Sequence, residues 1–469
     1  MKKLLFLLFL PIFSFAQLPT GCELTVLADN LNAPWEIEMG PDGRIWFTEK
    51  YGTIKVLNTF TKAIKELTII PNIVTTGEGG LLGMAFDPDF KNNKFLYCIY
   101  NFTPSQSLQR MRVIRFTHDE ILDTLKDLKV ILDGIKSNNI HNGSRITFGA
   151  DGKMYVSTGN AEGNGTIPPD PNSQNNLSLN GKVLRLNKDG SIPNDNPVQG
   201  SYIYSKGHRN IQGLAFGNNK LYASEHGFNE DEINIIQANR NYGWPGVEAW
   251  ADNASEVKFK KDSNCVDPIF VFNIASTNGD KAPSGMIYYN HSLIPSLQNS
   301  LLVGTLNANG RDISQFKLNT NGDSIIGTNT FFRNEFGRIR DLAQSIDGRI
   351  FFCTSNKDQY GAGVLKPGDD KIYEIKPIGY TPIKQINNET LSIFPNPANR
   401  NIYIKNSNLI GNSSFTIYNV DGKIMDQKNE IELIDDYLTV DISNLQNGIY
   451  ILQLHNNGKL FIGKVLILK

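Results

Sequence analysis

The chain has 469 residues, enough for one large domain and one small one. Its 46 Lys and Arg residues nearly balance its 47 Asp and Glu residues, so it lacks the basic excess of a nucleic-acid-binding surface. We therefore expect no nucleic-acid partner. Its 41 glycines, with abundant Asn and Asp, favour turns, and many turns imply many short strands.

The first residues are typical of a secretion signal. Lys2 and Lys3 form a positive region, an apolar run extends from Leu4 to Leu10, and Ala16 ends a small-residue cleavage site. The alternative is a membrane anchor, but the apolar run is too short to span a bilayer. We expect residues 1–16 to be a signal peptide.

Four cysteines, an even number, permit disulfides in an exported chain, with three possible full pairings. They are Cys22, Cys98, Cys265 and Cys353, and no C-x-x-C spacing points to a zinc or redox motif. Cys98 and Cys353 lie in apolar strand-like runs, which also suits buried thiols.

One short pattern recurs along the chain: a polar turn, often Asp-Gly, then a basic residue and an apolar strand-like run. Asp-Gly between apolar runs predicts hairpins with type I′ turns, which need positive φ at both central residues. The copies begin at Pro41, Asn92, Ala150, Asn218, Gln298 and Ile346, and the copy at Gln298 lacks the basic residue.

Each copy precedes another strand-like run, such as those at 53–57, 112–116, 182–186, 232–236 and 371–375. Repeats at roughly 50 to 80 residues, each supplying about four strands, are typical of propeller blades. We therefore expect an all-β fold in which residues 17–378 form a six-bladed β-propeller, counting about six repeats. The alternative, an unrelated array of β-sandwiches, is disfavoured by the regularity of the repeats.

A change in composition follows Lys376, and residues 379–389 are expected to be a linker. Short strand-like runs separated by turns then predict a small β-sandwich at 390–469. This segment resembles the type A sorting domain of type IX secretion substrates. The resemblance rests on Ile-Phe-Pro-Asn-Pro-Ala at 393–398, Asn-Gly-Ile-Tyr at 447–450 and the basic end at Lys469. The alternative is an ordinary accessory β-module.

Two early loops carry unusual residues. A glycine cluster around Glu78 would let the backbone approach a ligand closely, and no Gly-Lys-Ser/Thr follows it that would indicate a phosphate loop. His141 offers an imidazole, the natural base near neutral pH. Taken alone, each also fits an ordinary structural turn or a surface histidine.

Three later segments are also unusual. Residues 207–216 place one cation and two amides before a strand, and the carboxylates and carbonyls of 224–234 and 241–245 suit Ca²⁺. Arg338 and Arg340 share one face of a strand, where two guanidinium groups suit a polycarboxylate. Each segment, read alone, also fits a solvated loop or strand face.

Together these segments resemble the soluble glucose/sorbosone dehydrogenase family, which uses pyrroloquinoline quinone (PQQ). The resemblance covers residues 31–375. It rests on Gly-His-Arg-Asn-x-Gln-Gly-Leu-Ala-Phe at 207–216, Asp-Glu-Ile-Asn at 231–234 and Asn-Tyr-Gly-Trp-Pro at 241–245. It implies a six-bladed propeller that oxidises a sugar at its anomeric carbon with PQQ and Ca²⁺, passing electrons to an external acceptor.

The resemblance also implies roles for individual residues. His141 would be the catalytic base, and Arg209 would lie near the reacting carbonyl. Cofactor contacts would come from Glu78, Arg209, Asn210, Gln212, Asn307, Arg338 and Arg340. The carbonyls of Gly227 and Phe228 would bind the Ca²⁺ that polarises the quinone, and Glu232 with the Tyr242 carbonyl would bind a second, structural Ca²⁺.

Three positions depart from the family pattern. Glu78 replaces a frequent Gln, Asn160 replaces the Asp that orients the base, and Asn307 replaces a cofactor-binding Lys. Glu162 is our candidate to stand in for the missing carboxylate, and Lys281 or Arg311 for the missing cation. These changes predict weaker cofactor binding than in typical members.

Two other functions stay open from the sequence: a carbohydrate- or protein-binding propeller without redox chemistry, and a Ca²⁺-dependent hydrolase or lactonase. The tail implies export by the type IX machinery through periplasm and outer membrane, to a secreted or surface-attached state. The identity of the sugar and of the electron acceptor does not follow from the residues.

Overall fold

The structure is a computed structural model, and its described residues form two compact units that divide between Pro382 and Ile383. The expected signal peptide, most of the expected linker and Glu162 lie outside the described residues. The described ranges are 18–105, 108–161, 172–272, 281–307, 310–358, 365–381, 389–390, 392–405, 413–420, 422–431, 437–456 and 459–469.

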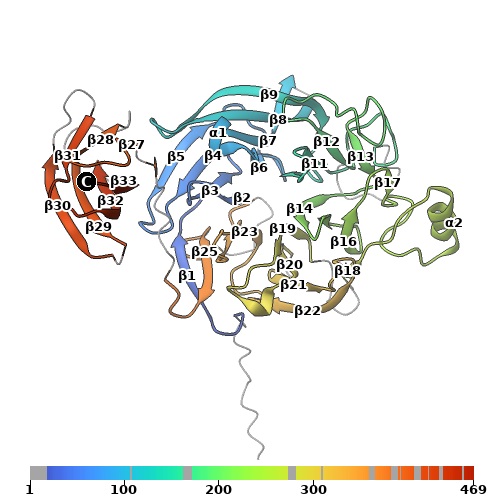
Figure 1. Cartoon of the computed structure of the whole chain (residues 1–469). Helices are drawn as coiled ribbons and strands as arrows, with labels where there is room; N and C mark the ends of the chain where they lie inside the picture. The colour runs from blue at the N-terminus through green and yellow to red at the C-terminus, as the bar shows by residue number, and fades with distance from the viewer. Residues whose placement is uncertain are drawn as a thin grey trace, which may run out of the picture. The chain divides into compact units, whose positions relative to one another are not determined.

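The first unit contains six sheets of four or five strands in its described residues (Figure 1). The first three sheets are β2 (Pro34–Met39), β3 (Ile45–Glu49), β4 (Thr53–Leu57), β5 (Ile64–Ile69); β6 (Leu81–Phe86), β7 (Phe95–Ser105), β8 (Leu108–Asp119), β9 (Thr124–Lys136); and β10 (Gly143–Phe148), β11 (Met154–Thr158), β12 (Lys182–Leu186), β13 (Ile203–Lys206), β17 (Arg240–Asn241). The other three are β14 (Ile211–Gly217), β15 (Lys220–Glu225), β16 (Asp231–Ile236), β18 (Phe270–Phe272); β19 (Pro283–Tyr289), β20 (Ser300–Thr305), β21 (Ile313–Leu318), β22 (Ile325–Phe331); and β23 (Ile339–Gln344), β24 (Ile350–Thr354), β25 (Ile372–Pro377), β1 (Cys22–Ala28). Short helices lie at α1 (Phe90–Asn93), α2 (Ala254–Asp262) and η1 (Pro295–Leu297).

The six sheets are arranged around a common axis, as in a β-propeller (Figure 1). The first strand of each sheet contacts the first strand of the next, and β23 contacts β2, so these inner strands form a ring. Strand β1, from the start of the described chain, pairs antiparallel with β25 and completes the last sheet. The two ends of this unit are therefore held together by the backbone hydrogen bonds of one sheet.

The three Asp-Gly hairpins form where the sequence predicts them, but with a different turn. Gly43, Gly152 and Gly348 have φ values of 76°, 70° and 87°, whereas the aspartates before them do not have positive φ. The Gly43 N–H donates to the Gly40 carbonyl (2.9 Å), and the Gly40 N–H donates to the Arg44 carbonyl (2.8 Å). This is a type I turn closed by a left-handed glycine, so the predicted type I′ geometry was wrong.

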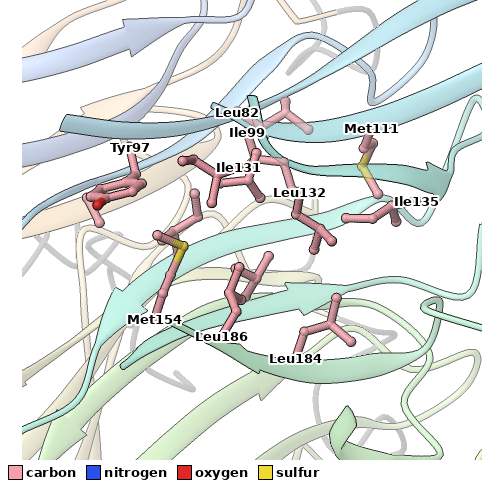
Figure 2. Close-up of a cluster of buried hydrophobic side chains, with 14 of the residues drawn as sticks. Leu82, Tyr97, Ile99, Met111, Ile131, Leu132, Ile135, Met154, Leu184 and Leu186 are labelled. Carbon is pink, nitrogen blue, oxygen red and sulfur yellow. The ribbon is translucent and has the colours of Figure 1, made fainter. Parts of the chain in front are cut away.

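The cores of the first unit lie between neighbouring sheets. Figure 2 shows one of them, where side chains from the β6–β9 sheet meet those from β10–β12. Leu82, Ile99, Met111, Met154 and Leu184 are almost completely buried there. Apolar side chains on both faces of a sheet explain why the strand sequences read as nearly continuous apolar runs. This packing fixes the strands whose ends carry the candidate site.

The second unit has two sheets around a single apolar core. One sheet contains β26 (Glu389–Thr390), β33 (Lys459–Ile467), β32 (Gly448–Asn456), β29 (Ser413–Asn419) and β30 (Ile424–Ile431), and the other contains β27 (Ser392–Phe394), β28 (Asn401–Lys405) and β31 (Tyr437–Asp441). Phe415, Ile417, Leu452 and Phe461 are fully or almost fully buried between them. The arrangement is that of a β-sandwich, and β26 begins at Glu389, inside the segment expected to be linker.

All four cysteines lie within the described residues, and all are free thiols. Cys98 and Cys353 are completely buried, which confirms them as core thiols. Burial raises the pKa of both thiols well above the usual value, which makes them unreactive. In the part of the chain that the structure describes, none of the helices combines the length and the apolar character that a membrane span requires.

Candidate active site

The candidate site residues gather at one end of the propeller axis because of strand direction. Neighbouring strands are antiparallel, so the residues before the first strand of a sheet meet those after its second strand. The residues that lie before a first strand or after a second strand include Lys50, Glu78, His141, Asn160, Arg209, Gly227, Asn307, Arg338 and Asp358. The site is thus assembled from loops of all six sheets.

His141 lies directly before β10, buried, with only 7% of its surface exposed. Its Nδ1 is 3.0 Å from the side-chain oxygen of Asn160, which follows β11. An amide oxygen only accepts hydrogen bonds, so Nδ1 carries the proton and the lone pair of Nε2 is left open. The backbone N–H of His141 donates to the Glu78 carboxylate (2.8 Å). Two of the three departures from the family pattern, Glu78 and Asn160, therefore contact the proposed base directly.

Two glycines allow the His141 loop to approach the loop after β11. A Cβ on Gly159 would lie 2.0 Å from the His141 carbonyl oxygen, and one on Gly143 would lie 2.6 Å from the Gly159 nitrogen. The Gly143 N–H also donates to the side chain of Asn210 (3.0 Å). No side chain fits in this space, so glycine is what brings the imidazole within reach of Asn160.

The imidazole of His141 is neutral over the whole physiological range. Burial, followed by the nearby charges of Arg209 and His226, lowers its pKa to about 3. The hydrogen bond from His141 Nδ1 to the Asn160 side-chain oxygen opposes this shift. A neutral imidazole with an open Nε2 is in the correct form to accept a proton, although the missing carboxylate leaves its protonated form poorly stabilised.

A cluster of cations surrounds Asp358 after β24. Arg340 donates to its carboxylate (2.9 Å), Lys50 donates to the other oxygen (2.6 Å), and the Arg338 guanidinium lies 3.7 Å away. Burial would raise the pKa of Asp358, but Arg340, Lys50 and Arg338 lower it. One carboxylate thus faces three cations, so this side of the site keeps a positive excess.

A narrow cavity opens beside this cluster. Its lining includes Arg340, Asp358, Gln212, Glu78 and Trp35. The Arg340 guanidinium is held by the Gln212 side chain (3.0 Å) and lies over the Trp35 ring (5.8 Å to its centroid). Asn142 and Gly143, next to His141, line the same cavity. The loop that carries the predicted base and one of the predicted guanidinium groups, that of Arg340, therefore line one cavity.

Asn307 follows β20, and neighbouring cations differ in their availability. The Lys281 ammonium is taken up by Asp312 (2.9 Å) and Ser314 (3.1 Å), so it does not replace the family's cofactor-binding lysine. Arg311 lies close enough to Arg338 to lower the pKa of that guanidinium. Both candidates lie near the site, since the Asn307 N–H donates to the Lys281 carbonyl (3.1 Å), but the Lys281 ammonium is already paired with Asp312.

The donors of this region fit an anionic, acceptor-rich group such as PQQ. The Nε atom of Arg338 and the side-chain nitrogen of Asn210 are buried, and neither has a hydrogen-bond partner among the described residues. Buried donors without acceptors are costly, and a ligand with several carboxylates would supply the acceptors. Burial and the neighbouring Arg340 lower the pKa of Arg338 to about 10, as expected for crowded cations.

One of the two predicted Ca²⁺-binding carbonyls, that of Gly227, accepts a hydrogen bond from a cationic side chain. Arg209 donates through one nitrogen to the carbonyls of His226 (3.0 Å) and Gly227, and its guanidinium lies near the rings of Phe228 (5.8 Å) and Trp244 (5.4 Å). Backbone carbonyl oxygens are ligands that Ca²⁺ prefers. The Gly227 carbonyl, which accepts from Arg209, is thus of the chemical type that a calcium ion binds.

The second predicted Ca²⁺ position has carboxylates without a matching cation. Glu232 is buried; it accepts from Asn234 (2.8 Å) and from the Ala249 N–H (2.6 Å). Burial and then the Glu225 carboxylate raise its pKa. The side-chain oxygen of Asn234 is buried without a partner, which leaves an oxygen donor for a metal. The ring of Tyr242 stacks on that of His208, with 4.5 Å between the ring centroids, and His208 in turn contacts the Glu225 carboxylate (2.9 Å).

Across the described ranges, the structure has no group of three or more His, Cys, Asp or Glu side chains arranged to hold a metal. The predicted sites use mainly backbone carbonyls, which such a grouping does not count. Oxygen ligands with few carboxylates suit a calcium ion shared with an anionic ligand.

Three site residues were missed from the sequence: Lys50, Asp358 and Glu248. Lys50 and Asp358 are 308 positions apart, so no local spacing connects them. Glu248 accepts hydrogen bonds from the turn that carries Gly227 and Phe228. The signal that could have found it is its place three residues after the Asn-Tyr-Gly-Trp-Pro motif.

A β-propeller with a buried imidazole beside a cavity lined by Arg340, at one end of its axis, has the features of a small-molecule site. Comparison with known proteins gives the family. The family model described as Glucose / Sorbosone dehydrogenase matches residues 31–363. Because this match covers most of the chain, the protein belongs to the glucose/sorbosone dehydrogenase family. The model of the Secretion system C-terminal sorting domain matches residues 392–468. Both resemblances inferred from the sequence are confirmed.

Individual relatives agree with this family. Quinoprotein glucose dehydrogenase B of Acinetobacter calcoaceticus is 39% identical over 255 residues, covering 49% of this chain and 53% of that protein, so the match spans about half the relative's length. Aldose sugar dehydrogenase YliI of Escherichia coli is 28% identical over 364 residues, covering 74% and 93%. The PQQ-bound aldose sugar dehydrogenase of Streptomyces coelicolor superposes with a TM-score of 0.63 at 32% identity, covering 76% and 99%.

Proposed function

We propose that this protein is a PQQ- and Ca²⁺-dependent dehydrogenase that oxidises an aldose at its anomeric carbon to the lactone. The observation that carries the proposal is the neutral, buried imidazole of His141, held at Nδ1 by Asn160 and placed next to the cavity that Arg340 lines. The names of the relatives support PQQ as cofactor and a sugar as substrate. Two electrons leave each sugar, and an external acceptor takes them.

When bound, PQQ supplies the two-electron oxidant for the hydride from C1, and Ca²⁺ polarises it as a Lewis acid. His141 accepts the proton of the anomeric hydroxyl at Nε2. Asn160 keeps the ring oriented, because its amide oxygen holds Nδ1–H at 3.0 Å. Loss of the proton and the hydride turns the C1 hydroxyl into the lactone carbonyl.

The remaining residues bind and orient. Arg338 and Arg340 would hold cofactor carboxylates, and Arg209 would place a positive charge near the reacting oxygen. Amide groups and one carboxylate would complete the cofactor contacts: Glu78, Asn210, Gln212 and Asn307. Arg340 and Lys50 share Asp358, which fixes the guanidinium before any ligand arrives. Glu162 is our candidate for an additional carboxylate near the base.

Two calcium ions complete the proposed site. The carbonyls of Gly227 and Phe228 would bind the catalytic ion, and Glu232 with the carbonyl of Tyr242 would bind the structural one. Support comes from the oxygen-rich donor sets and from the partner-less oxygen of Asn234. We also propose that the six sheets are the blades of a six-bladed propeller, with residues 17–378 as the enzyme domain.

We further propose that the protein acts outside the cell. Residues 1–16 would direct it to the periplasm, and the sorting domain at 390–469, after the linker at 379–389, would direct it through the outer membrane by type IX secretion. The match to a secretion-system sorting domain supports this route. The mature enzyme is then released or attached to the outer surface.

The test is reduction of an artificial electron acceptor by a panel of aldoses, using purified protein with PQQ and Ca²⁺. We expect dye reduction with at least one aldose and its loss in His141→Ala. Sugar binding without reduction would instead indicate a binding propeller, and hydrolysis of lactones without PQQ would indicate a hydrolase.

A further inference from the structure

Glu248 accepts hydrogen bonds from three successive backbone N–H groups. One carboxylate oxygen accepts from Phe228, Asn229 (2.7 Å) and Glu230 (3.2 Å), and the other accepts from the Asn229 side chain (3.3 Å). Successive N–H groups that converge in one turn form a concave site for an anion. Here the anion is a side chain of the protein itself, reaching across from the segment after β17.

The hydrogen bonds fix the peptide units that matter for the proposed metal. In a trans peptide the N–H of one residue points opposite to the carbonyl of the residue before it. The N–H of Phe228 belongs to the same unit as the Gly227 carbonyl, and the N–H of Asn229 to the same unit as the Phe228 carbonyl. By holding these two N–H groups, Glu248 turns both carbonyls away from itself, and the Gly227 carbonyl accepts from Arg209 on that far side.

The same turn is held from a second direction. The Gly227 N–H donates to Asp231 (3.1 Å), whose other oxygen accepts from the N–H groups of Lys281 (2.8 Å) and Ala282 (2.9 Å). A Cβ on Gly227 would lie 1.9 Å from the Glu230 carbonyl, so the turn is too tight for any other residue there. Asp231 anchors the start of the turn, and Glu248 sets the orientation of its middle.

The segment that carries Glu248 also reaches the second proposed calcium position. The N–H of Ala249, the next residue, donates to the Glu232 carboxylate (2.6 Å). Burial raises the pKa of both Glu230 and Glu232, and the Glu248 carboxylate adds to both shifts. Burial lowers the pKa of Arg209, and Glu248 is the carboxylate that most opposes that shift. The Glu248 carboxylate therefore interacts electrostatically with charged groups on both sides of the turn.

We propose that Glu248 is a positioning residue for the catalytic calcium ion: it holds the 227–230 turn so that the Gly227 and Phe228 carbonyls face the metal. Its negative charge also favours a cation on the far side of the two peptide units. A bound cation would polarise these peptides and strengthen their N–H groups as donors to Glu248, so the two interactions support each other. This inference rests on the function proposed above.

The test compares Glu248→Gln with Glu230→Gln. Each variant removes one carboxylate charge next to the 227–230 turn. Only Glu248→Gln weakens the acceptor of the three N–H groups. Metal-free full-length protein is titrated with PQQ at a series of buffered Ca²⁺ concentrations, and the absorbance of bound PQQ is followed. The readout is the free Ca²⁺ concentration at half-maximal PQQ binding, with the unfolding temperature of each Ca²⁺-free variant as a check of folding.

We expect Glu248→Gln to raise the half-saturating Ca²⁺ concentration by about tenfold, the size expected from weakening charge-assisted hydrogen bonds. Glu230→Gln should shift it less than about twofold, as a change of one partly exposed charge does. Excess Ca²⁺ should restore the turnover of Glu248→Gln, which a purely structural defect would not allow. Equal shifts in the two variants, or a defect that Ca²⁺ does not rescue, would overturn the positioning role. If the wild-type protein binds no PQQ at any Ca²⁺ concentration, the proposed function fails, and this inference fails with it.

Discussion

One side of the candidate site has more buried positive than negative groups, and the other side has more buried negative groups. On the side of β23 and β24, Asp358 is shared by Arg340, Arg338 and Lys50, and these cations lower its pKa against the effect of burial. On the side of β15 and β16, Glu232 is buried beside Glu225, and its pKa is raised. Unmatched buried charge is costly, so each side is best completed by a ligand of the opposite sign.

This difference indicates how one cavity could accept an anionic quinone and a cation together. The cation-rich side matches the carboxylates of PQQ, and the oxygen-rich side matches calcium. His141 contacts both charge types, since burial and the Arg209 guanidinium lower its pKa and its backbone N–H donates to Glu78. The predictions below remove one charge or one hydrogen bond at a time from this arrangement.

The largest effect is expected from removing the base. His141→Gln should lower the turnover number by about 10²- to 10⁴-fold, the contribution usual for a positioned general base. PQQ affinity should stay nearly the same, because the cofactor contacts are on other residues. Turnover is measured by dye reduction and affinity by absorbance titration. A variant that retained wild-type turnover would remove His141 from the mechanism.

A smaller effect is expected on the cation-rich side. Arg340→Met should lower PQQ affinity about a hundredfold, because the proposed charge-assisted contact to a cofactor carboxylate is lost. Arg349→Met is the matched control, since Arg349 is similarly buried and paired with Glu374 (2.6 Å), but lies just before β24, at the end of that strand away from the site. Titration of both variants with PQQ separates a local loss of affinity from a general effect on the fold. Similar losses in both would contradict the role of Arg340.

A substitution at Asn160 should raise the turnover number rather than lower it. Asn160→Asp places a carboxylate beside Nδ1 of His141, which raises the pKa of the imidazole and stabilises its protonated form. We expect the turnover number to rise by roughly tenfold, since the reverse change at a protease histidine is much more costly. Steady-state kinetics at saturating sugar checks this. No change, or a decrease, would indicate that another group such as Glu162 already supplies the charge.

The smallest effect concerns stability in acid. His141 has a folded-state pKa of about 3 against an ordinary value of 6.5, so below pH 6.5 the unfolded chain takes up a proton that the folded chain does not. Stability should therefore fall as the pH decreases from about 6.5 toward 3, by up to about 1.4 kcal/mol per pH unit from this residue. In His141→Gln this part of the slope should disappear. Urea unfolding of metal-free protein at pH 5, 6 and 7 measures it.

Much of the fold could be predicted from the sequence because its signals are local. The recurring Asp-Gly turns and the apolar runs after them predicted strands that the structure contains, such as β4 and β12. The turn type was wrong because the hairpin loops contain one residue more than a type I′ turn, with only Gly43 and its equivalents in the left-handed region. Dipeptide identity alone does not determine loop length.

The site was harder to predict where its contacts join distant segments. His141, Arg209 and Arg340 stand in motifs that resemble the family, so they could be named from the sequence. Lys50 and Asp358 are each unremarkable in their own loops, and their ion pair exists only because β3 and β24 end at the same end of the axis. Lys281, in contrast, was a candidate for the replacement cation from its sequence position, but its ammonium is paired with Asp312.

The most direct test of the whole account is a single-turnover measurement on protein loaded with PQQ and Ca²⁺, mixed with an aldose without any electron acceptor. The absorbance of the cofactor should change to that of the reduced form within seconds for the wild-type protein. In His141→Gln the cofactor should bind but stay oxidised over the same time. Failure of the wild-type protein to bind PQQ, or equal reduction in the variant, would contradict the proposal that a sugar is oxidised through His141.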